Sequence, residues 1–112
     1  MVPSVTTAFA RKLIKLERQL RILYDQPHLM GAAVYVQRAV VIVQSKHHSV
    51  RVADLTIYGE FYCPRCVDDM DCNNQDIPVM EGMLMAEAPT CTGCDAPIAG
   101  ITVEPPRGDG EP

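Results

Sequence analysis

The sequence is poor in aromatic residues and contains no tryptophan. Only 5% of its 112 residues are aromatic, whereas 47% are hydrophobic, so any core must be built mainly from aliphatic side chains. One compact domain, with or without an arm, is expected at this length. The chain also lacks an uninterrupted run of 18 apolar residues, which a membrane span would need. Residues 1–10 have neither the basic start nor the apolar run of a secretory signal. We therefore expect a cytoplasmic protein in a reducing compartment, without membrane contact.

Motifs of catalysis are missing as well. The sequence has no glycine-rich phosphate loop, no Ser/His/Asp set, and no pair of carboxylates at a recognisable helical spacing. We therefore expect no enzymatic activity and predict no catalytic residue.

The cysteines, in contrast, are grouped. There are five, an odd number that suits a disulfide framework poorly. Four of them form the pairs "CPRC" and "CTGC", which are separated by 24 residues: Cys63, Cys66, Cys91 and Cys94. In each pair one tight turn can present two sulfurs to one ion, and zinc favours thiolates in a tetrahedral shell. In a reducing compartment such pairs are more often a metal site than two disulfides. We predict one structural Zn²⁺ per chain.

Residues 55–103 resemble the zinc-ribbon class: a strand enters "CPRC", a spacer follows, and "CTGC" leads into another strand. The resemblance implies a structural metal and frequent roles in nucleic-acid or transcription machinery, but no reaction. Val67 and Asp95 stand where ribbon turns often carry glycine.

Two other readings of the paired cysteines stay open. Rubredoxin-type iron shares the two pairs, although its aromatic core has little counterpart here, and a redox dithiol pair is the second alternative. The role of the fifth cysteine, Cys72, is also open. It is either an unused thiol, an alternative ligand, or part of a redox switch if it can reach a metal thiolate.

Charge is divided unevenly along the chain. The net charge is −4, but residues 1–51 carry +6 and residues 52–112 carry −10. Such asymmetry bears on partners rather than on fold. The possible contacts for nucleic acid or a protein partner are the cations of the first helical segment: Arg11, Lys12, Lys15, Arg18 and Arg21. A solvated helix face is the simpler explanation of this stripe.

Residues 1–49 are predicted to form an antiparallel helical hairpin for docking or dimerisation. In the first helix, apolar residues recur at spacings of 4, 3, 4 and 3, as in a seam that packs on another helix. The seam residues are Phe9, Leu13, Leu16, Leu20 and Leu23. Residues 28–47 are rich in β-branched side chains, which favour strand. A helix is preferred because a strand of this length would be unusual.

Residues 50–104 are predicted to form a small zinc-ribbon-like β domain, with strands at 55–62, 80–88 and 97–104. Residues 105–112 have the composition of a disordered tail. The fold class is therefore α+β.

The function that these features favour is a non-catalytic, zinc-binding adaptor or regulatory protein that acts through protein–protein contacts. Its partner would be another protein or a second copy of itself, and a homodimer would form through the helices. A nucleic-acid or transcription machine is one setting for such a partner. Two alternatives remain: a thiol-based redox or metal-handling protein, and a direct nucleic-acid binder that uses the basic first helix. The identity of the partner, the pathway and the host are not encoded in any motif.

Overall fold

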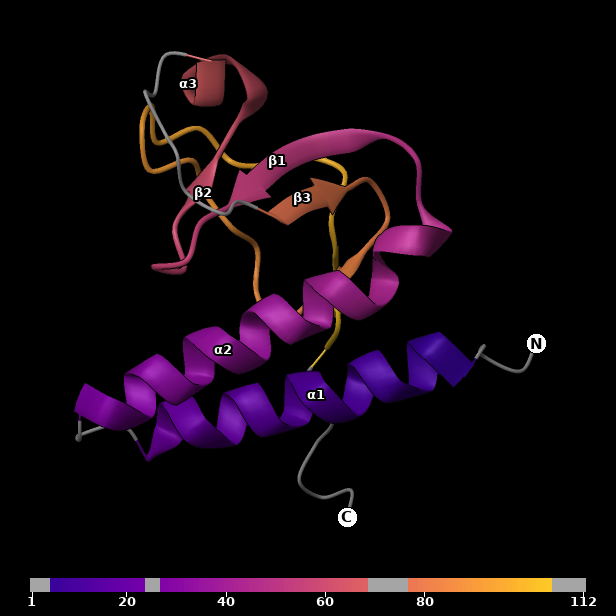
Figure 1. The fold of residues 1–112 in the computed structure, drawn as a ribbon, viewed down its shortest axis with the longest axis vertical. Coiled ribbons are helices and arrows are strands. Elements are labelled where there is room, and N and C mark those ends of the chain that lie inside the picture. Colours follow the sequence, from indigo (N-terminus) through magenta and orange to yellow (C-terminus); the bar gives the residue numbers. More distant parts are fainter. Residues whose placement is uncertain (1–4, 24–26, 69–76, 106–112) are drawn as a thin grey trace.

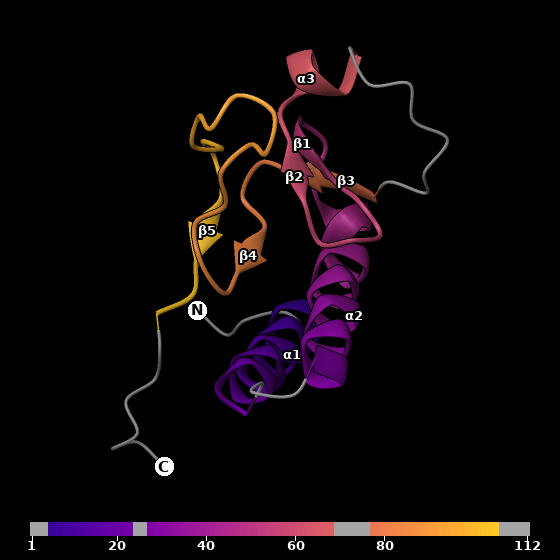
Figure 2. The same cartoon turned by 90° about the vertical axis from the view of Figure 1, so that its left-hand side faces the viewer.

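The structure is a computed structural model, and it describes residues 5–23, 27–68 and 77–105 (Figure 1). Two long helices open the chain: α1 (Val5–Ile22) and α2 (Pro27–Gln44), which ends in a short 3₁₀ turn, η1 (Ser45–His47). They lie side by side and antiparallel, and most of the β structure lies on one side of the pair (Figures 1 and 2). The prediction of an α+β fold with an N-terminal helical hairpin is confirmed.

Two small sheets follow the hairpin. The first has the order β2-β1-β3 and is antiparallel, with β1 at Arg51–Leu55, β2 at Phe61–Tyr62 and β3 at Ile77–Met80. The second pairs β4 (Leu84–Met85) with β5 (Thr102–Val103) in parallel. A short helix, α3 (Pro64–Asp68), follows β2 and lies at the far end of the molecule from α1 and α2 (Figures 1 and 2).

The segment between residues 28 and 47 is helical, as its length led us to predict. Most of this stretch is α2. Its buried side chains recur at spacings of three and four, which place them on one helical face: Ala33, Gln37, Val40, Val41 and Gln44. Packing of this face therefore overrides the strand preference of the β-branched residues.

The strand predicted at 55–62 is instead a tight hairpin. β1 ends at Leu55 and β2 begins at Phe61. Thr56 closes the turn: its N–H donates to the Glu60 carbonyl at 2.9 Å, and its Oγ1 accepts from the N–H groups of Tyr58 and Glu60, at 3.2 Å each. Gly59 has φ of 80°, a left-handed conformation that glycine adopts without strain. The strands predicted at 80–88 and 97–104 are shorter too, being β4 and β5.

The face of α1 that packs on the rest of the chain is not the predicted seam. The buried residues of α1 are Ala10, Ile14 and Glu17. Among the seam residues, Phe9, Leu16 and Leu23 are 49%, 42% and 60% exposed, whereas Leu13 and Leu20 are half-buried. The small side chain of Ala10 and the ion-paired Glu17 let this other face approach its neighbours, and the edge of the seam that Phe9, Leu16 and Leu23 form is left exposed.

A single apolar cluster connects the hairpin with the β region. It contains Val41 from α2 and residues from both sheets and the loops: Ala53, Leu55, Phe61, Val79, Met83, Met85, Cys91 and Ile98. Cys91 is fully buried in this cluster, so the second cysteine pair is anchored in the core.

Within the described ranges, no helix combines the length and the apolar character that crossing a lipid bilayer requires. The predicted tail begins at the edge of these ranges: Pro105 is described, and residues 106–112 lie outside them.

Candidate metal centre

The first cysteine pair is shaped by a single turn of helix. Cys63 follows β2 directly, and Pro64 begins α3. Proline suits the first position of a helix because the N–H that it lacks would have no helical partner there. The N–H of Val67 donates to the Cys63 carbonyl at 3.0 Å, which closes the turn. Val67 therefore has no need of the left-handed conformation that favours glycine in ribbon turns, because this turn continues as a helix.

The second cysteine pair is held beside the first by backbone contacts. Phe61 and Cys91 form a parallel bridge, and the N–H of Thr92 donates to the Phe61 carbonyl at 2.7 Å. The turn then closes through the N–H of Asp95, which donates to the Cys91 carbonyl at 2.8 Å. Asp95 has φ of 63°, and aspartate is among the few residues that tolerate this left-handed conformation. Asp95 thus takes the place of the glycine expected after the second cysteine.

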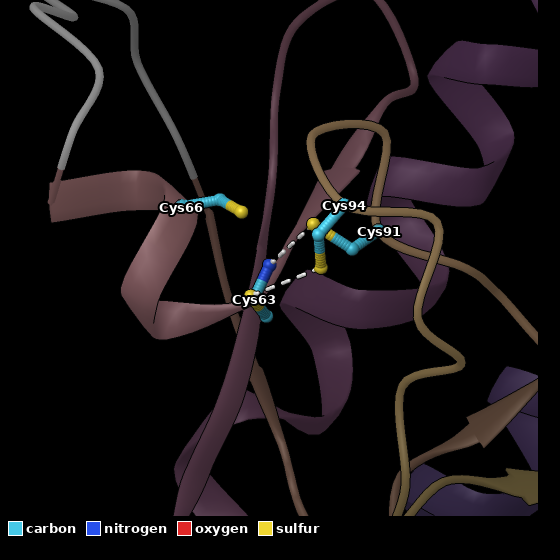
Figure 3. Close-up of side chains that lie close together, drawn as sticks. All are labelled: Cys63, Cys66, Cys91 and Cys94. Atoms are coloured by element: carbon cyan, nitrogen blue, oxygen red, sulfur yellow. Dashed lines mark hydrogen bonds between the residues drawn. The ribbon is translucent and has the colours of Figure 1, made fainter.

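These two turns bring the four sulfurs together (Figure 3). All four Sγ atoms lie within 4.8 Å of one another. The Sγ atoms of Cys63 and Cys94 are 3.9 Å apart. In a tetrahedral zinc site with Zn–S bonds of about 2.3 Å, neighbouring sulfurs are separated by about 3.8 Å. The four cysteines that the spacing predicts therefore form one cluster of the size that a single ion needs.

Gly93 makes this approach possible. A Cβ atom built on Gly93 would lie 2.9 Å from the Sγ atom of Cys66 and 3.1 Å from its Cβ atom. Real Cβ atoms essentially never come so close to a neighbour. The absence of a side chain at residue 93 therefore lets Cys66 reach the other pair.

Backbone hydrogen bonds lower the pKa of one of the four thiols, that of Cys91, and so favour its thiolate form. Burial raises the pKa of Cys91, but N–H groups of Cys63, Cys94 and Gly93 outweigh it and lower the pKa to about 6. The N–H of Cys63 lies 3.3 Å from the Sγ atom of Cys91 (Figure 3). The hydrogen bond from Cys66 to Cys91, followed by one with Cys63, raises the pKa of Cys66 to about 12. Without a metal, Cys66 therefore keeps its proton more readily than Cys91 does.

The donor set fits zinc. Four thiolates fill a tetrahedral shell completely, which is typical of structural rather than catalytic zinc sites. Burial differs around the cluster: Cys91 is buried, Cys63 and Cys66 are half-buried, and Cys94 is exposed. In the described part of the chain, the thiols of these cysteines form no disulfide. The cluster could hold a metal ion. Cys72 lies outside the described residues, so its role stays a prediction.

The predicted contact residues of α1 fall into two groups: the three arginines contact other parts of the chain, and the two lysines are exposed. Arg18 donates through Nη2 to the carbonyl oxygens of Ala86, at 2.7 Å, and of Glu104. Arg11 pairs with the Glu104 carboxylate at 3.2 Å, and Arg21 pairs with Glu17 at 3.1 Å. Lys12 and Lys15 are exposed. Three of the five predicted contact residues therefore have partners within the chain.

Sequence reasoning gave no role to three buried polar residues that form internal contacts. Glu17, Gln44 and Glu104 are 1%, 4% and 6% exposed. Each lies next to apolar positions in the sequence, where a polar residue is a weak signal of an internal partner. The partner of Glu17 is Arg21, which lies four residues along the same helix, a spacing that the sequence already offers. The partners of Gln44 and Glu104 depend on the packing of α1 and α2 on the β region.

Comparisons of the chain with protein-family models, with curated proteins and with solved structures found no match. The chemistry of the four thiols and the surfaces that the hairpin exposes are therefore the basis for proposing a function.

Proposed function

We propose that the chain is a non-catalytic zinc-binding adaptor of the zinc-ribbon class, in which one structural Zn²⁺ holds the β region and the helical hairpin docks a protein. The observation that carries the proposal is the gathering of the Sγ atoms of Cys63, Cys66, Cys91 and Cys94 within 4.8 Å. A short chain poor in aromatic residues benefits from such a metal, since zinc binding can contribute about 10–16 kcal/mol to folding.

The proposed docking surface is the outward seam of α1. Phe9, Leu16 and Leu23 are seven residues apart and therefore share one face, and each is at least 42% exposed. Val5, one turn before Phe9, is 87% exposed on the same side. Large apolar side chains left in water along four turns of a helix indicate an interaction site. A partner helix with apolar residues at matching spacing would cover them.

Two lysines beside the proposed docking surface indicate that the partner carries acidic residues around its apolar ones. Lys12 lies within the seam and Lys15 beside it, and both are exposed. A partner with acidic residues at the edges of its contact surface would meet these cations favourably, and would bind more weakly at high salt. The partner is either another protein or the same helix of a second copy, which would complete a four-helix bundle.

Native mass spectrometry of the purified chain tests both parts of the proposal. We expect one zinc ion per chain, retained under conditions that keep the fold. A dimer that becomes monomeric with Leu16→Glu would identify the second copy as the partner, whereas a monomeric wild type would exclude it. Absence of zinc after purification in zinc-containing buffer would contradict the metal assignment.

One observation favours a redox or metal-handling function as the second candidate. Cys94 is exposed, and its sulfur lies 3.9 Å from that of Cys63, so an oxidant could reach this pair. A redox protein should release zinc and form disulfides under mild oxidant, and recover both with a thiol reductant. An adaptor should keep its zinc under the same treatment. Measurement of zinc release against peroxide concentration separates the two functions.

Direct nucleic-acid binding has less support. Arg11, Arg18 and Arg21 have partners within the chain, and among the five residues of the stripe Lys12 and Lys15 are the exposed ones. Binding to single- or double-stranded DNA that falls steeply with salt, and that is lost with Lys12→Glu and Lys15→Glu, would support this function.

A further inference from the structure

A pocket of about 380 Å³ lies between the helical hairpin and the segment that leads into the second cysteine pair. Its walls come from α1, α2, the turn before β2, and residues 85–92. Four charged residues line it: the acids Glu17, Glu60 and Glu87, and the cation Arg21. The charge of the lining is therefore negative even after Arg21 is counted.

Glu17 is the deepest of these acids. It is 1% exposed, and its Oε2 atom accepts from Nε of Arg21 at 3.1 Å. Burial raises the pKa of Glu17, and the charge of Glu87 adds to this effect, although Arg21 and Arg18 act in the opposite direction. Arg18 itself is bonded to two carbonyl oxygens of the β region. Arg21 thus contacts one oxygen of the Glu17 carboxylate, while the hydrogen bonds of Arg18 go to the β region.

Gln37 provides an independent indication that a donor is missing. Its side chain is 94% buried, because only 6% is exposed, and it lines the same pocket. Within the described ranges, its Oε1 atom has no hydrogen-bond partner. A Cβ atom built on Gly59, another residue of the pocket wall, would lie 3.4 Å from that oxygen. Buried acceptors in proteins are normally paired, so an unpaired one at a pocket wall suits a ligand with N–H groups.

The remaining walls are apolar or neutral. Phe61, Met85 and Pro89 are buried and expose little surface, whereas Ala86 and Ala88 contribute carbon surface and Thr90 and Thr92 contribute hydroxyl groups. A ligand would therefore meet a mainly polar surface of acidic, amide and hydroxyl acceptors with a small apolar part. Small-molecule sites have volumes of about 300–1,000 Å³, so the pocket is large enough for a short ligand.

We propose that this pocket binds a small organic cation, namely an alkylammonium compound with a short aliphatic chain. The ammonium group would donate to acceptors such as Glu17, Glu87 and the Gln37 amide, and the short aliphatic chain would lie against Ala86 and Ala88. The site is separate from the thiol cluster and requires no docking partner, so the proposal goes beyond the adaptor function.

Titration of the zinc-loaded, full-length protein with 1,4-diaminobutane tests the proposal. Amide signals are followed by two-dimensional NMR. We expect saturable shifts in residues 59–61 and 85–92. The neutral analogue 1,4-butanediol and the anionic analogue succinate should bind at least tenfold more weakly. Equal binding of the neutral analogue, or shifts spread evenly over the acidic half of the protein, would overturn the proposal.

Two variants make the test specific to the pocket. Glu87→Gln, at an exposed position of the lining, should weaken diamine binding at least threefold without loss of folding. Glu81→Gln removes the same charge from an exposed position outside the lining, and it should leave binding unchanged. Equal weakening by both variants would show a general electrostatic attraction and would overturn the proposal. Glu17→Gln should abolish binding if the variant folds, and Glu87→Gln keeps the test decisive if it does not.

Discussion

Gln44, the last residue of α2, forms two hydrogen bonds with the backbone of a single residue, Leu84. The N–H of Leu84 donates to Oε1 of Gln44 at 2.8 Å, and Nε2 of Gln44 donates to the Leu84 carbonyl at 3.0 Å. The same Nε2 donates to the Val40 carbonyl at 2.8 Å, which orients the amide. The glutamine side chain thus pairs with β4 as a neighbouring strand would, and it fixes the helical hairpin to the β region.

Substitution of Gln44 by methionine should destabilise the protein. The variant keeps the approximate length of the side chain but leaves the N–H and C=O of Leu84 without partners, at a cost of about 1–3 kcal/mol for each buried group. Urea unfolding followed by circular dichroism measures the effect. Gln19→Met, at an exposed position of α1, is the matched control and should change the free energy of unfolding by less than about 0.5 kcal/mol. Equal stability of the two variants would contradict the role of Gln44.

Replacement of Arg18 by lysine should be nearly as harmful as replacement by methionine. Nη2 of Arg18 donates to the carbonyl oxygens of both Ala86 and Glu104. The ammonium group of lysine ends one bond short of Nη2 on a flexible stem, so it should reach both oxygens poorly. We expect a loss of about 1.5–3 kcal/mol, as for hydrogen bonds to charged groups. Chemical denaturation at equilibrium measures it. Lys15→Met, at an exposed residue on the same helix, is the control. Full stability of Arg18→Lys would show that charge alone is required.

Serine at any residue of the ligand set should remove zinc. Cys63→Ser or Cys91→Ser leaves three sulfurs, and the folding energy that zinc supplies, on the order of 10–16 kcal/mol in small zinc domains, should largely be lost. Metal content by mass spectrometry and thermal unfolding measure the two effects. Cys72→Ser is the control and is expected to retain both zinc and stability. Loss of zinc in that control equal to the loss in Cys91→Ser would show that the ligand set is wrong.

A single methyl group at residue 93 should weaken the site. In Gly93→Ala the new Cβ atom would meet the Sγ atom of Cys66 at 2.9 Å, so this sulfur has to move away from the others. We expect zinc affinity to fall at least roughly tenfold, which corresponds to about 1.4 kcal/mol. Competition with a chromogenic chelator measures the affinity. Gly31→Ala is the control, because a Cβ atom at that helical position meets nothing within 4 Å. It should leave zinc affinity unchanged and favour the helix by about 1 kcal/mol.

Protonation of Glu17 at low pH should stabilise the folded protein. Burial raises the pKa of Glu17 above its ordinary value of 4.5, so the folded chain binds this proton at a higher pH than the unfolded chain does. The stabilisation from protonated Glu17 is complete below pH 4.5 and is lost as the pH rises through the folded pKa. Glu17→Gln, which cannot ionise, should therefore become more stable relative to wild type as the pH rises from 4.5 to 8.

The measurement for Glu17 is the difference in the free energy of unfolding between the two proteins across that range. Subtraction removes the pH dependence of zinc binding, which both proteins share. The charged groups that act on Glu17 are Arg21, Arg18 and Glu87, and they are the same in both proteins. A difference that stays constant with pH would show that the pKa of Glu17 is not raised.

The two cysteine pairs could be recognised in the sequence because their spacing is local. Two residues between cysteines suffice to place two sulfurs on one turn, whatever the rest of the chain does. The helices were readable for a similar reason, since apolar residues at spacings of three and four indicate a helix. The strands were read less well because the pairs that form the sheets, such as Ala53 with Val79, are distant in sequence. Alternation in 55–62 resembled a strand, but the hydrogen bonds of Thr56 close a turn there.

The sequence by itself thus determined which four sulfurs can share an ion, that two helices precede them, and that the charge of the chain is divided. Only the tertiary structure decided which face of α1 is buried, because periodicity shows that apolar residues share a face but not which neighbour covers it. It also decided that Arg11 and Arg18 form contacts within the chain. Their shared partner, Glu104, lies more than 80 residues away and contacts them only when β5 is in place.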